Sequence, residues 1–218
     1  MVLFMNYRRN NKRFSVAGRG EYLSTSDFIV KYYTNLDACR KFFFDMKWPT
    51  GYYCEKCGCT HYYFMKSKNC YRCAHCKHDE RLFTNTIFQD NKLPLNVLLY
   101  GLFLIFTSKK GISSLELSEE LKVNYKTACL LQTKARILMK NSNSKKSLDS
   151  SFYESDVAYT GAPSHNGKRG LGTDKQPFLV VLSTEQENKY PLYIKLHEVS
   201  SDSGNIIQAF FDQYVKMS

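Results

Sequence analysis

The chain has 218 residues, 43% of them apolar, with 16 Tyr and 15 Phe. This is enough for real hydrophobic cores and excludes disorder throughout. The formal charge is +11 and the pI about 9.2. Residues 1–150 carry 25 Lys and Arg against 12 Asp and Glu, whereas residues 151–218 carry 6 against 8. The first part therefore has the charge of a polyanion binder and the last part does not; a generally basic protein is the alternative.

Cysteine usage indicates the redox compartment of the protein, and hydropathy tests whether a segment could cross a membrane. Six of the eight cysteines fall within residues 54–76, and the apolar run Met1–Met5 is too short for a secretory signal. We therefore expect metal binding in a reducing compartment, cytoplasmic and nucleoid-associated, and no disulfides. The longest apolar run, Leu93–Phe106, is shorter than the ~20 residues that cross a bilayer and contains Asn96. We read it as a buried helix and expect no membrane partner.

Residues 1–48 predict a basic arm followed by two helices. The first 25 residues are basic and aromatic, and they either touch phosphates or form a solvated tail. Ser26–Asp27 is the candidate cap of the first helix. The second helix follows Asn35 and ends near Trp48–Pro49, because proline stops helical continuation. We expect both helices to pack against the module that follows.

Two Cys-x-x-Cys pairs lie fifteen residues apart within residues 49–90: Cys54, Cys57, Cys73 and Cys76. Four thiolates at this spacing predict a structural Zn²⁺ site of the zinc-ribbon type, with each sulfur about 2.3 Å from one tetrahedral ion. Residues 62–64 and 71–72 would be the strands that carry the two pairs. Gly58, directly after the first pair, lets the backbone bend closely around the metal.

Other residues near the pairs are weaker candidates for the same site. They are Cys59, Cys70, His61, His75 and His78, none of which completes a Cys-x-x-Cys pair. Cys39 fits a core position better than a ligand position. A closed zinc site does folding work and no chemistry, so a structural clip without contact to nucleic acid is an alternative for the whole ribbon.

Residues 91–141 predict three helices. Pro94 suits the first turn of an apolar helix through Phe106. Ser113 and Glu116 form the capping box of a short second helix, and Asn124 caps a longer third helix. A short helix, a tight turn and a longer helix are typical of a helix-turn-helix.

The start of the third helix is where a recognition helix meets base edges and phosphates of double-stranded DNA. Four candidate contacts stand there, Tyr125, Lys126, Thr127 and Gln132, and two more stand in the basic loop before the short helix, Lys109 and Lys110. An ordinary helical hairpin is the alternative, although the basic surroundings favour DNA.

The last part of the chain changes character. Residues 142–151 are rich in Asn, Ser and Lys and predict a linker. Residues 152–218 predict strands over 152–159, 178–182 and 190–199 and a final helix capped by Asp202 or Ser203. This is a thin domain, because the helix covers one face of the sheet and nothing is left for the other.

Three segments together resemble one family. They are Trp48-Pro49 with Cys54-Glu55-Lys56-Cys57-Gly58, the stretch from Tyr71 to Ala128, and Glu154-Ser155-Asp156-Val157-Ala158-Tyr159-Thr160-Gly161. The chain resembles bacterial insertion-sequence transposases that have an N-terminal zinc ribbon and a DDE-type, RNase H-like core. The fold class expected from this resemblance is α+β with several modules: a zinc ribbon and a helix-turn-helix, followed by a partial RNase H-like α/β domain.

The resemblance implies a catalytic site in which three acidic or amide side chains hold two Mg²⁺ ions roughly 3.5–4 Å apart. Asp156 matches the first of these ligands, with a structural carboxylate as the alternative. Val157–Ala158 stands where the family usually has Glu-Thr, and the second and third ligands have no counterpart before Ser218. We therefore expect the front part of a transposase, either truncated by mutation or recorded short, whose chain alone does not catalyse strand transfer.

Two other functions stay open. One is a non-enzymatic DNA-binding remnant or repressor of transposition that uses the same front modules. The other is a zinc-stabilised interaction module with no nucleic-acid role. A homo-oligomer is an open expectation for either of the DNA-binding functions.

Overall fold

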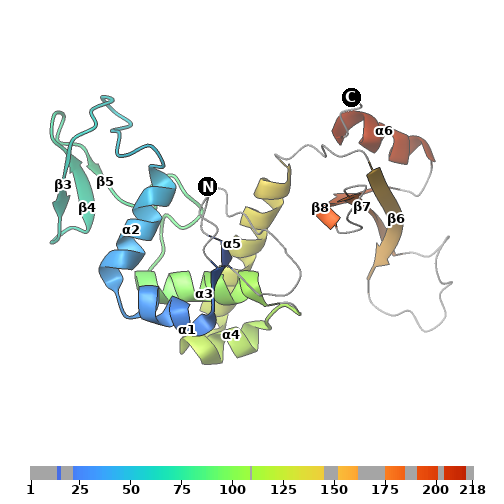
Figure 1. Ribbon diagram of the computed structural model, residues 1–218, viewed down its shortest axis with the longest axis horizontal. Helices are drawn as coiled ribbons and strands as arrows, with labels where there is room; N and C mark the ends of the chain where they lie inside the picture. The colour runs from blue at the N-terminus through green and yellow to red at the C-terminus, as the bar shows by residue number, and fades with distance from the viewer. Residues whose placement is uncertain are drawn as a thin grey trace. The chain divides into compact units, whose positions relative to one another are not determined.

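The computed structural model describes residues 14–15, 22–108, 110–144, 152–161, 175–184, 191–200 and 204–214. The chain forms two compact units, Met1–Ser142 and Asn143–Ser218 (Figure 1). The first unit combines helices with two small antiparallel sheets, and the second has one three-stranded antiparallel sheet and a helix. The mixed α and β architecture is confirmed. No helix in the described part of the chain is long and apolar enough to span a membrane.

The described structure begins with a small two-stranded sheet and a capped helix. Strands β1 (Phe14–Ser15) and β2 (Tyr22–Leu23) pair antiparallel, and α1 (Thr25–Phe28) follows. Its N-cap is Ser24, whose hydroxyl accepts a 3.1 Å hydrogen bond from the Asp27 amide while the Asp27 carboxylate accepts one from the Ser24 amide. Asp27 thus takes part in the cap as predicted, but the cap residue is not Ser26. Most of the predicted basic arm lies outside the described residues.

A π-helix, η1 (Ile29–Tyr33), continues α1 and leads to α2 (Leu36–Lys47). Asn35 caps α2 as predicted, because its side-chain oxygen accepts hydrogen bonds from the amides of two following residues. The helix ends at Lys47, and Trp48 is its C-cap, directly before a proline.

Three short strands follow α2: β3 (Tyr62–Met65), β4 (Cys70–Cys73) and β5 (Asp79–Glu80). They form one antiparallel sheet in the order β3-β4-β5. Aromatic side chains join this sheet to α2, since the Phe44 ring lies 4.8 Å from that of Trp48 and 5.1 Å from that of Tyr71. The ribbon and α2 therefore share one core. Residues 83–88, predicted as a strand or turn, form a turn.

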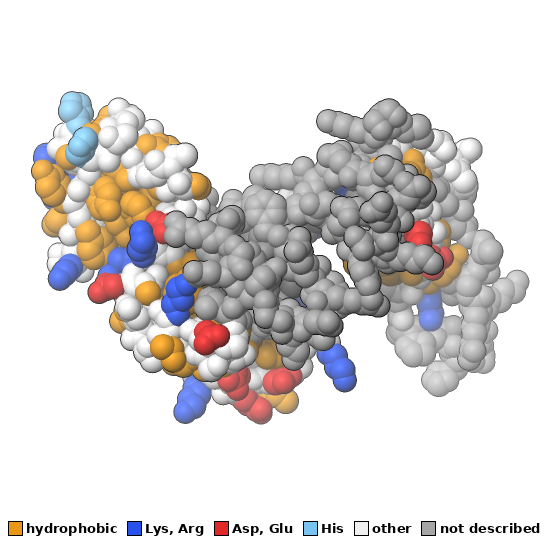
Figure 2. All heavy atoms as spheres, in the orientation of Figure 1, with side chains coloured by type: hydrophobic (Ala, Val, Ile, Leu, Met, Phe, Trp, Pro, Cys, Tyr) orange, Lys and Arg blue, Asp and Glu red, His pale blue; other side chains and the backbone are white. Residues whose placement is uncertain are grey.

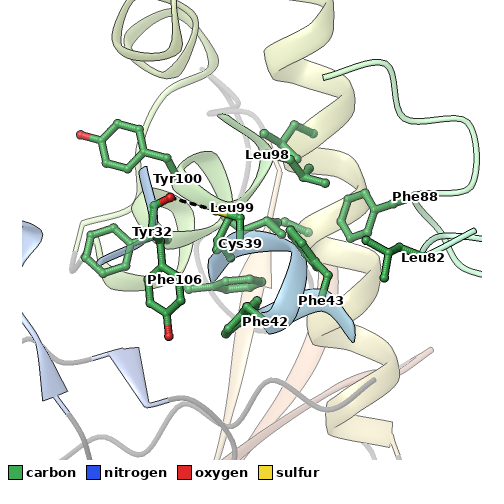
Figure 3. Packing of buried hydrophobic residues seen from close by; sticks show 14 of the residues in the cluster. Tyr32, Cys39, Phe42, Phe43, Leu82, Phe88, Leu98, Leu99, Tyr100 and Phe106 are labelled. Atoms are coloured by element: carbon green, nitrogen blue, oxygen red, sulfur yellow. Dashed lines mark hydrogen bonds between the residues drawn. The ribbon is translucent and has the colours of Figure 1, made fainter. Parts of the chain in front are cut away.

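Three helices complete the first unit: α3 (Leu95–Thr107), α4 (Ser114–Leu121) and α5 (Tyr125–Ser144). Seven of the thirteen residues of α3 are buried, so the apolar run is a core helix as predicted. Figure 3 shows part of this core, with side chains of α2 beside those of α3. A Cβ at Gly101 would lie only 2.6 Å from a methyl of Leu131 and 2.8 Å from one of Leu121. Glycine at this position lets α3 approach α4 and α5 closely.

The second unit contains β6 (Phe152–Thr160), β7 (Gln176–Thr184), β8 (Pro191–Glu198) and α6 (Gly204–Tyr214). The strands pair antiparallel in the order β6-β7-β8. Asp202 and Ser203, predicted to cap the last helix, lie outside the described residues. So does most of the predicted linker, of which the part up to Ser144 continues α5.

The two faces of this sheet differ. Leu179 and Val181 of β7 are buried and form a core with Phe210 of α6. Side chains alternate along a strand, so the next residue, Val180, belongs to the opposite face, where the register places Asp156 and Leu196 on either side of it. That opposite face is open, since Leu196 is 58% exposed. It carries carboxylates beside its apolar side chains, because Glu154 and Asp156 of β6 both belong to it.

Candidate metal centre

The four paired cysteines come together in the ribbon. Their sulfurs all lie within 4.8 Å of one another. Two contacts join one pair to the other: Cys54 Sγ lies 3.6 Å from Cys76 Sγ, and Cys57 Sγ lies 3.5 Å from Cys73 Sγ. The two pairs therefore face one another across a single point.

The sulfur–sulfur distances are close to those of a tetrahedral zinc site. Sulfurs bound at about 2.3 Å to a tetrahedral zinc ion are about 3.8 Å apart. The observed sulfur contacts are close to that edge length, and four thiols are the donor set of structural zinc sites. Within the described residues this is the one group of three or more His, Cys, Asp or Glu side chains that could hold an ion. The site fits Zn²⁺.

Each pair sits in a backbone turn of the same construction. The amide of Cys54 donates to the Cys59 carbonyl at 2.9 Å, and the amide of Cys73 donates to the His78 carbonyl at 2.9 Å. Gly58 has a φ of 72°, a left-handed conformation that glycine adopts without steric cost. The sequence thus folds locally into two matching turns, which we call knuckle 1 (Cys54–Cys59) and knuckle 2 (Cys73–His78).

The electrostatics of the cluster favour a cation. Burial raises the pKa of Cys73, but the amides of Cys76 and His75 and the neighbouring thiols act against burial and bring the pKa to about 6. The amide of Cys59 lowers the pKa of Cys57, whereas burial and the neighbouring thiols raise it, to about 12. Four sulfurs this close cannot all carry negative charge unless a positive ion lies among them.

The other candidate ligands lie outside this cluster. Cys59, Cys70, His61, His75 and His78 are not among the four residues whose donor atoms converge. Cys70 is buried in β4. Cys39 is a core residue of α2, and its thiol donates to the carbonyl of Tyr32 at 3.0 Å (Figure 3).

The predicted DNA contacts at the start of α5 differ in exposure. Tyr125 is 54% exposed, Lys126 is exposed and Thr127 is half-buried. Gln132 is only 5% exposed. Its side-chain amide donates to the Ile112 carbonyl at 2.6 Å, and its oxygen accepts from the Ser114 hydroxyl at 2.9 Å. Gln132 is thus occupied inside the fold, and we do not retain it as a DNA contact.

The burial of Gln132 could have been predicted from the periodicity of α5. Ala128 and Ala135 are fully buried, and Gln132 follows the first by four residues and precedes the second by three. Residues at these spacings lie on the same side of a helix. The bonds of Gln132 hold the loop before α4 against α5.

That loop carries Lys110, which is exposed, while Lys109 lies outside the described residues. Helix α4 has the opposite charge. Figure 2 shows acidic side chains over α4, where three residues are exposed: Glu116, Glu119 and Glu120. Any phosphate backbone would be repelled from this side of the helix pair.

Asp156 lies on the open face of the second sheet and is exposed. Its carboxylate accepts a 2.8 Å hydrogen bond from the Val157 amide. Among the described residues it belongs to no group of three metal-binding side chains. Mg²⁺ sites draw on more than one carboxylate or on substrate phosphates, so the donors described around Asp156 do not fit that ion.

Comparison with known protein families supports the zinc-ribbon interpretation of the segment with the paired cysteines. No curated protein and no solved structure matches the chain. Residues 35–79 match the family model described as the transposase zinc-ribbon domain. This segment contains α2 with its cap, both knuckles and strands β3 and β4. The front of the chain is therefore similar to the zinc-ribbon domain of transposases.

Proposed function

We propose that this chain is a transposase-related protein that binds double-stranded DNA at the ends of a mobile element. The observation that carries the proposal is the match of residues 35–79 to a transposase zinc-ribbon domain, combined with four sulfurs at the spacing of a zinc site. The basic charge of residues 1–150 supports a polyanionic partner.

In this proposal Cys54, Cys57, Cys73 and Cys76 bind one structural Zn²⁺ ion. The ion would supply folding energy and no chemistry, because all four of its positions are taken by the protein. The protein contributes the two knuckles, whose backbone bonds set the direction of the sulfurs.

Helices α4 and α5 form the DNA-binding helix-turn-helix. Tyr125, Lys126 and Thr127 contact the duplex at the start of α5, and Lys110 contacts a phosphate from the loop that Gln132 holds in place. Lys109, next to it in the sequence, is a further candidate for a phosphate contact. The acidic side of α4 faces away from the phosphates, so the duplex meets the pair from the α5 side.

The second unit would be the start of an RNase H-like core with Asp156 as its first metal ligand. A second candidate function, a non-enzymatic DNA-binding remnant or repressor, is favoured by the surroundings of Asp156. Within the described residues Val180 of β7 pairs with it, Leu196 of β8 lies beyond Val180, and neither is a metal ligand. We derive no catalytic step from this unit.

The DNA-binding proposal is tested by the salt dependence of affinity. The full zinc-loaded chain is titrated onto a duplex at several salt concentrations, and log K is plotted against log salt. Replacing Lys126 by Ala should weaken binding and reduce the slope by about 1, because one phosphate contact is lost. Lys41→Ala, at an exposed lysine of α2, is the control and should leave the slope unchanged. A wild-type slope near zero would refute the proposal.

A cleavage assay separates the two candidate functions. Plasmid DNA is incubated with the full chain and Mg²⁺ or Mn²⁺. Nicking that Asp156→Asn abolishes would support an enzyme, whereas DNA binding without nicking would support the remnant or repressor.

A further inference from the structure

Helix α5 has one side in the core and presents large apolar side chains on the other side. Ala128, Leu131 and Ala135 are buried at spacings of three and four residues, which is the pattern of a core-facing side. Leu130 and Ile137, in contrast, are 55% and 42% exposed. They are seven residues apart, which is close to two full turns of a helix, so they lie in one line along its surface. This line needs an explanation, because exposed positions of a helix are usually polar.

Four residues make up the outward row of α5, at spacings of four, three and four: Lys126, Leu130, Thr133 and Ile137. Lys126 and Thr133 are exposed as well. The Thr133 hydroxyl donates to the Cys129 carbonyl at 2.9 Å within the helix. A hydroxyl has one proton, so Thr133 offers a partner its methyl group and no donor. The outward row thus begins with an ammonium and continues with three apolar groups.

The charge of α5 indicates what kind of partner the outward row fits. The helix contains four basic residues and no acidic residue: Lys126, Lys134, Arg136 and Lys140. A second copy pairing through the same row would bring like charges together. Two apolar residues one heptad apart also fall short of the roughly three heptads that sustain a coiled coil. A polyanion, and so a DNA duplex, is the better complement of this helix.

The dimensions of the row agree with a major groove. Recognition helices contact base edges with their first turns. A rise of 1.5 Å per residue puts Thr133 about 10 Å along the axis from Lys126, and Ile137 about 16 Å from it. The major groove of B-DNA is about 12 Å wide. The outward row therefore fits the groove from Lys126 to Thr133, and Ile137 lies beyond it.

We propose that α5 reads base pairs through Lys126, Leu130 and Thr133, and that Leu130 selects an A·T pair by packing on the methyl group of thymine. This inference rests on the proposed binding of double-stranded DNA. The base pairs display hydrogen-bond donors and acceptors in the major groove, and the C5 methyl of thymine is their one large apolar group. A leucine placed against a donor or acceptor would remove its water and give no hydrogen bond in return, which costs free energy. Leu130 thus favours thymine and disfavours the other bases at the same position.

The test uses the full zinc-loaded chain and a pool of duplexes in which about 20 base pairs, two turns of the double helix, are random. Repeated binding to the wild type selects a preferred sequence. The selected duplex is then synthesised with uracil, which lacks only the C5 methyl, in place of thymine at each A·T pair in turn. We expect uracil at one or more positions to lower wild-type affinity about fourfold, the effect of one methyl group removed from water.

Leu130→Ala should bind the thymine and uracil duplexes equally, because the shorter side chain no longer reaches the methyl group. The matched control is Ile137→Ala, at an exposed apolar residue of the same row that lies beyond the groove. It should keep both the affinity of the wild type and its fourfold preference for thymine. Both positions are exposed, so urea unfolding should show that both variants are as stable as the wild type.

Three results would overturn the inference. The first is a wild type that binds thymine and uracil duplexes equally at every position, and the second is a Leu130→Ala variant that keeps the preference for thymine. The third is a wild-type dimer that both Leu130→Ala and Ile137→Ala convert to monomers in analytical ultracentrifugation, because the outward row would then join two copies of the chain.

The same titrations separate failure of this inference from failure of the proposed function. A wild type that does not bind the random pool at low salt would overturn the proposed DNA binding itself. Salt-dependent binding to the pool without a preference for thymine would overturn only the base reading by α5.

Discussion

Lys77 in knuckle 2 adopts the left-handed backbone conformation that Gly58 adopts in knuckle 1. Their φ angles are 59° and 72°, and each residue follows the second cysteine of its pair. Glycine reaches this region without steric cost, whereas a residue with a Cβ pays about 1 kcal/mol. The Lys77 ammonium donates to the Ala74 carbonyl at 2.8 Å, which offsets part of that cost. The two knuckles thus adopt the same left-handed backbone conformation, one with a glycine and the other with a lysine.

This difference predicts the order of two variants at position 77. Lys77→Gly and Lys77→Ala both remove the bond to Ala74, but only glycine relieves the left-handed strain. We expect the Gly variant to be more stable than the Ala variant by about 1 kcal/mol. Urea unfolding of the zinc-loaded chain measures this. Equal stabilities would mean that the turn relaxes when the lysine is removed.

The burial of Gln132 and the exposure of Lys126 predict that substitutions at these two positions of α5 have different effects, one on stability and the other on DNA binding. Gln132→Ala removes bonds to Ser114 and Ile112 inside the fold, so we expect a loss of about 1–3 kcal/mol in the free energy of unfolding. Lys126→Ala, on the exposed start of the same helix, should weaken DNA binding and leave stability within about 0.5 kcal/mol. Urea unfolding and a DNA titration of both variants make the check. The reverse pattern would restore Gln132 to the DNA interface.

The parts of the fold that local chemistry determines could be predicted from the sequence. Asn35 and Ser113 cap helices because their side chains bond amides two or three residues away, and nothing distant is involved. The spacing of the four cysteines is also a local property of two tight turns. The sulfur cluster follows from it once the strands pair.

The rest depends on residues that meet only after folding. Lys47 and Glu80 are separated by both knuckles, and nothing in the sequence indicated that the Lys47 ammonium lies 2.6 Å from a Glu80 carboxylate oxygen. Lys195 is only 4% exposed although lysine is normally found at the surface. Strand β5 has only two residues, too few for a visible alternation of side chains. In each case tertiary packing overrides what the local pattern indicates.

Cys39 predicts a pH effect on stability. Burial raises the pKa of its thiol from 9.0 to about 11. A raised folded pKa means that the stabilisation is complete below pH 9 and is lost as the pH rises toward 11. We expect the difference in unfolding free energy between the wild type and Cys39→Ala to be constant from pH 7 to 9 and to shrink above it. Urea titrations at each pH measure the difference, in which the other titrating groups cancel. A difference that stays constant to pH 11 would contradict the burial of this thiol.

The two faces of the second sheet predict different costs for the same substitution at adjacent positions. Val181 is fully buried and belongs to the cluster that α6 covers, so Val181→Ala should cost about 2 kcal/mol through lost burial and a residual cavity. Val180 lies between Asp156 and the exposed Leu196 on the open face, so Val180→Ala should cost less than half as much. Thermal or urea unfolding of the full chain compares them directly. Equal costs would mean that a further segment or a second copy covers the open face in solution, because only burial from both sides makes the two valines equivalent.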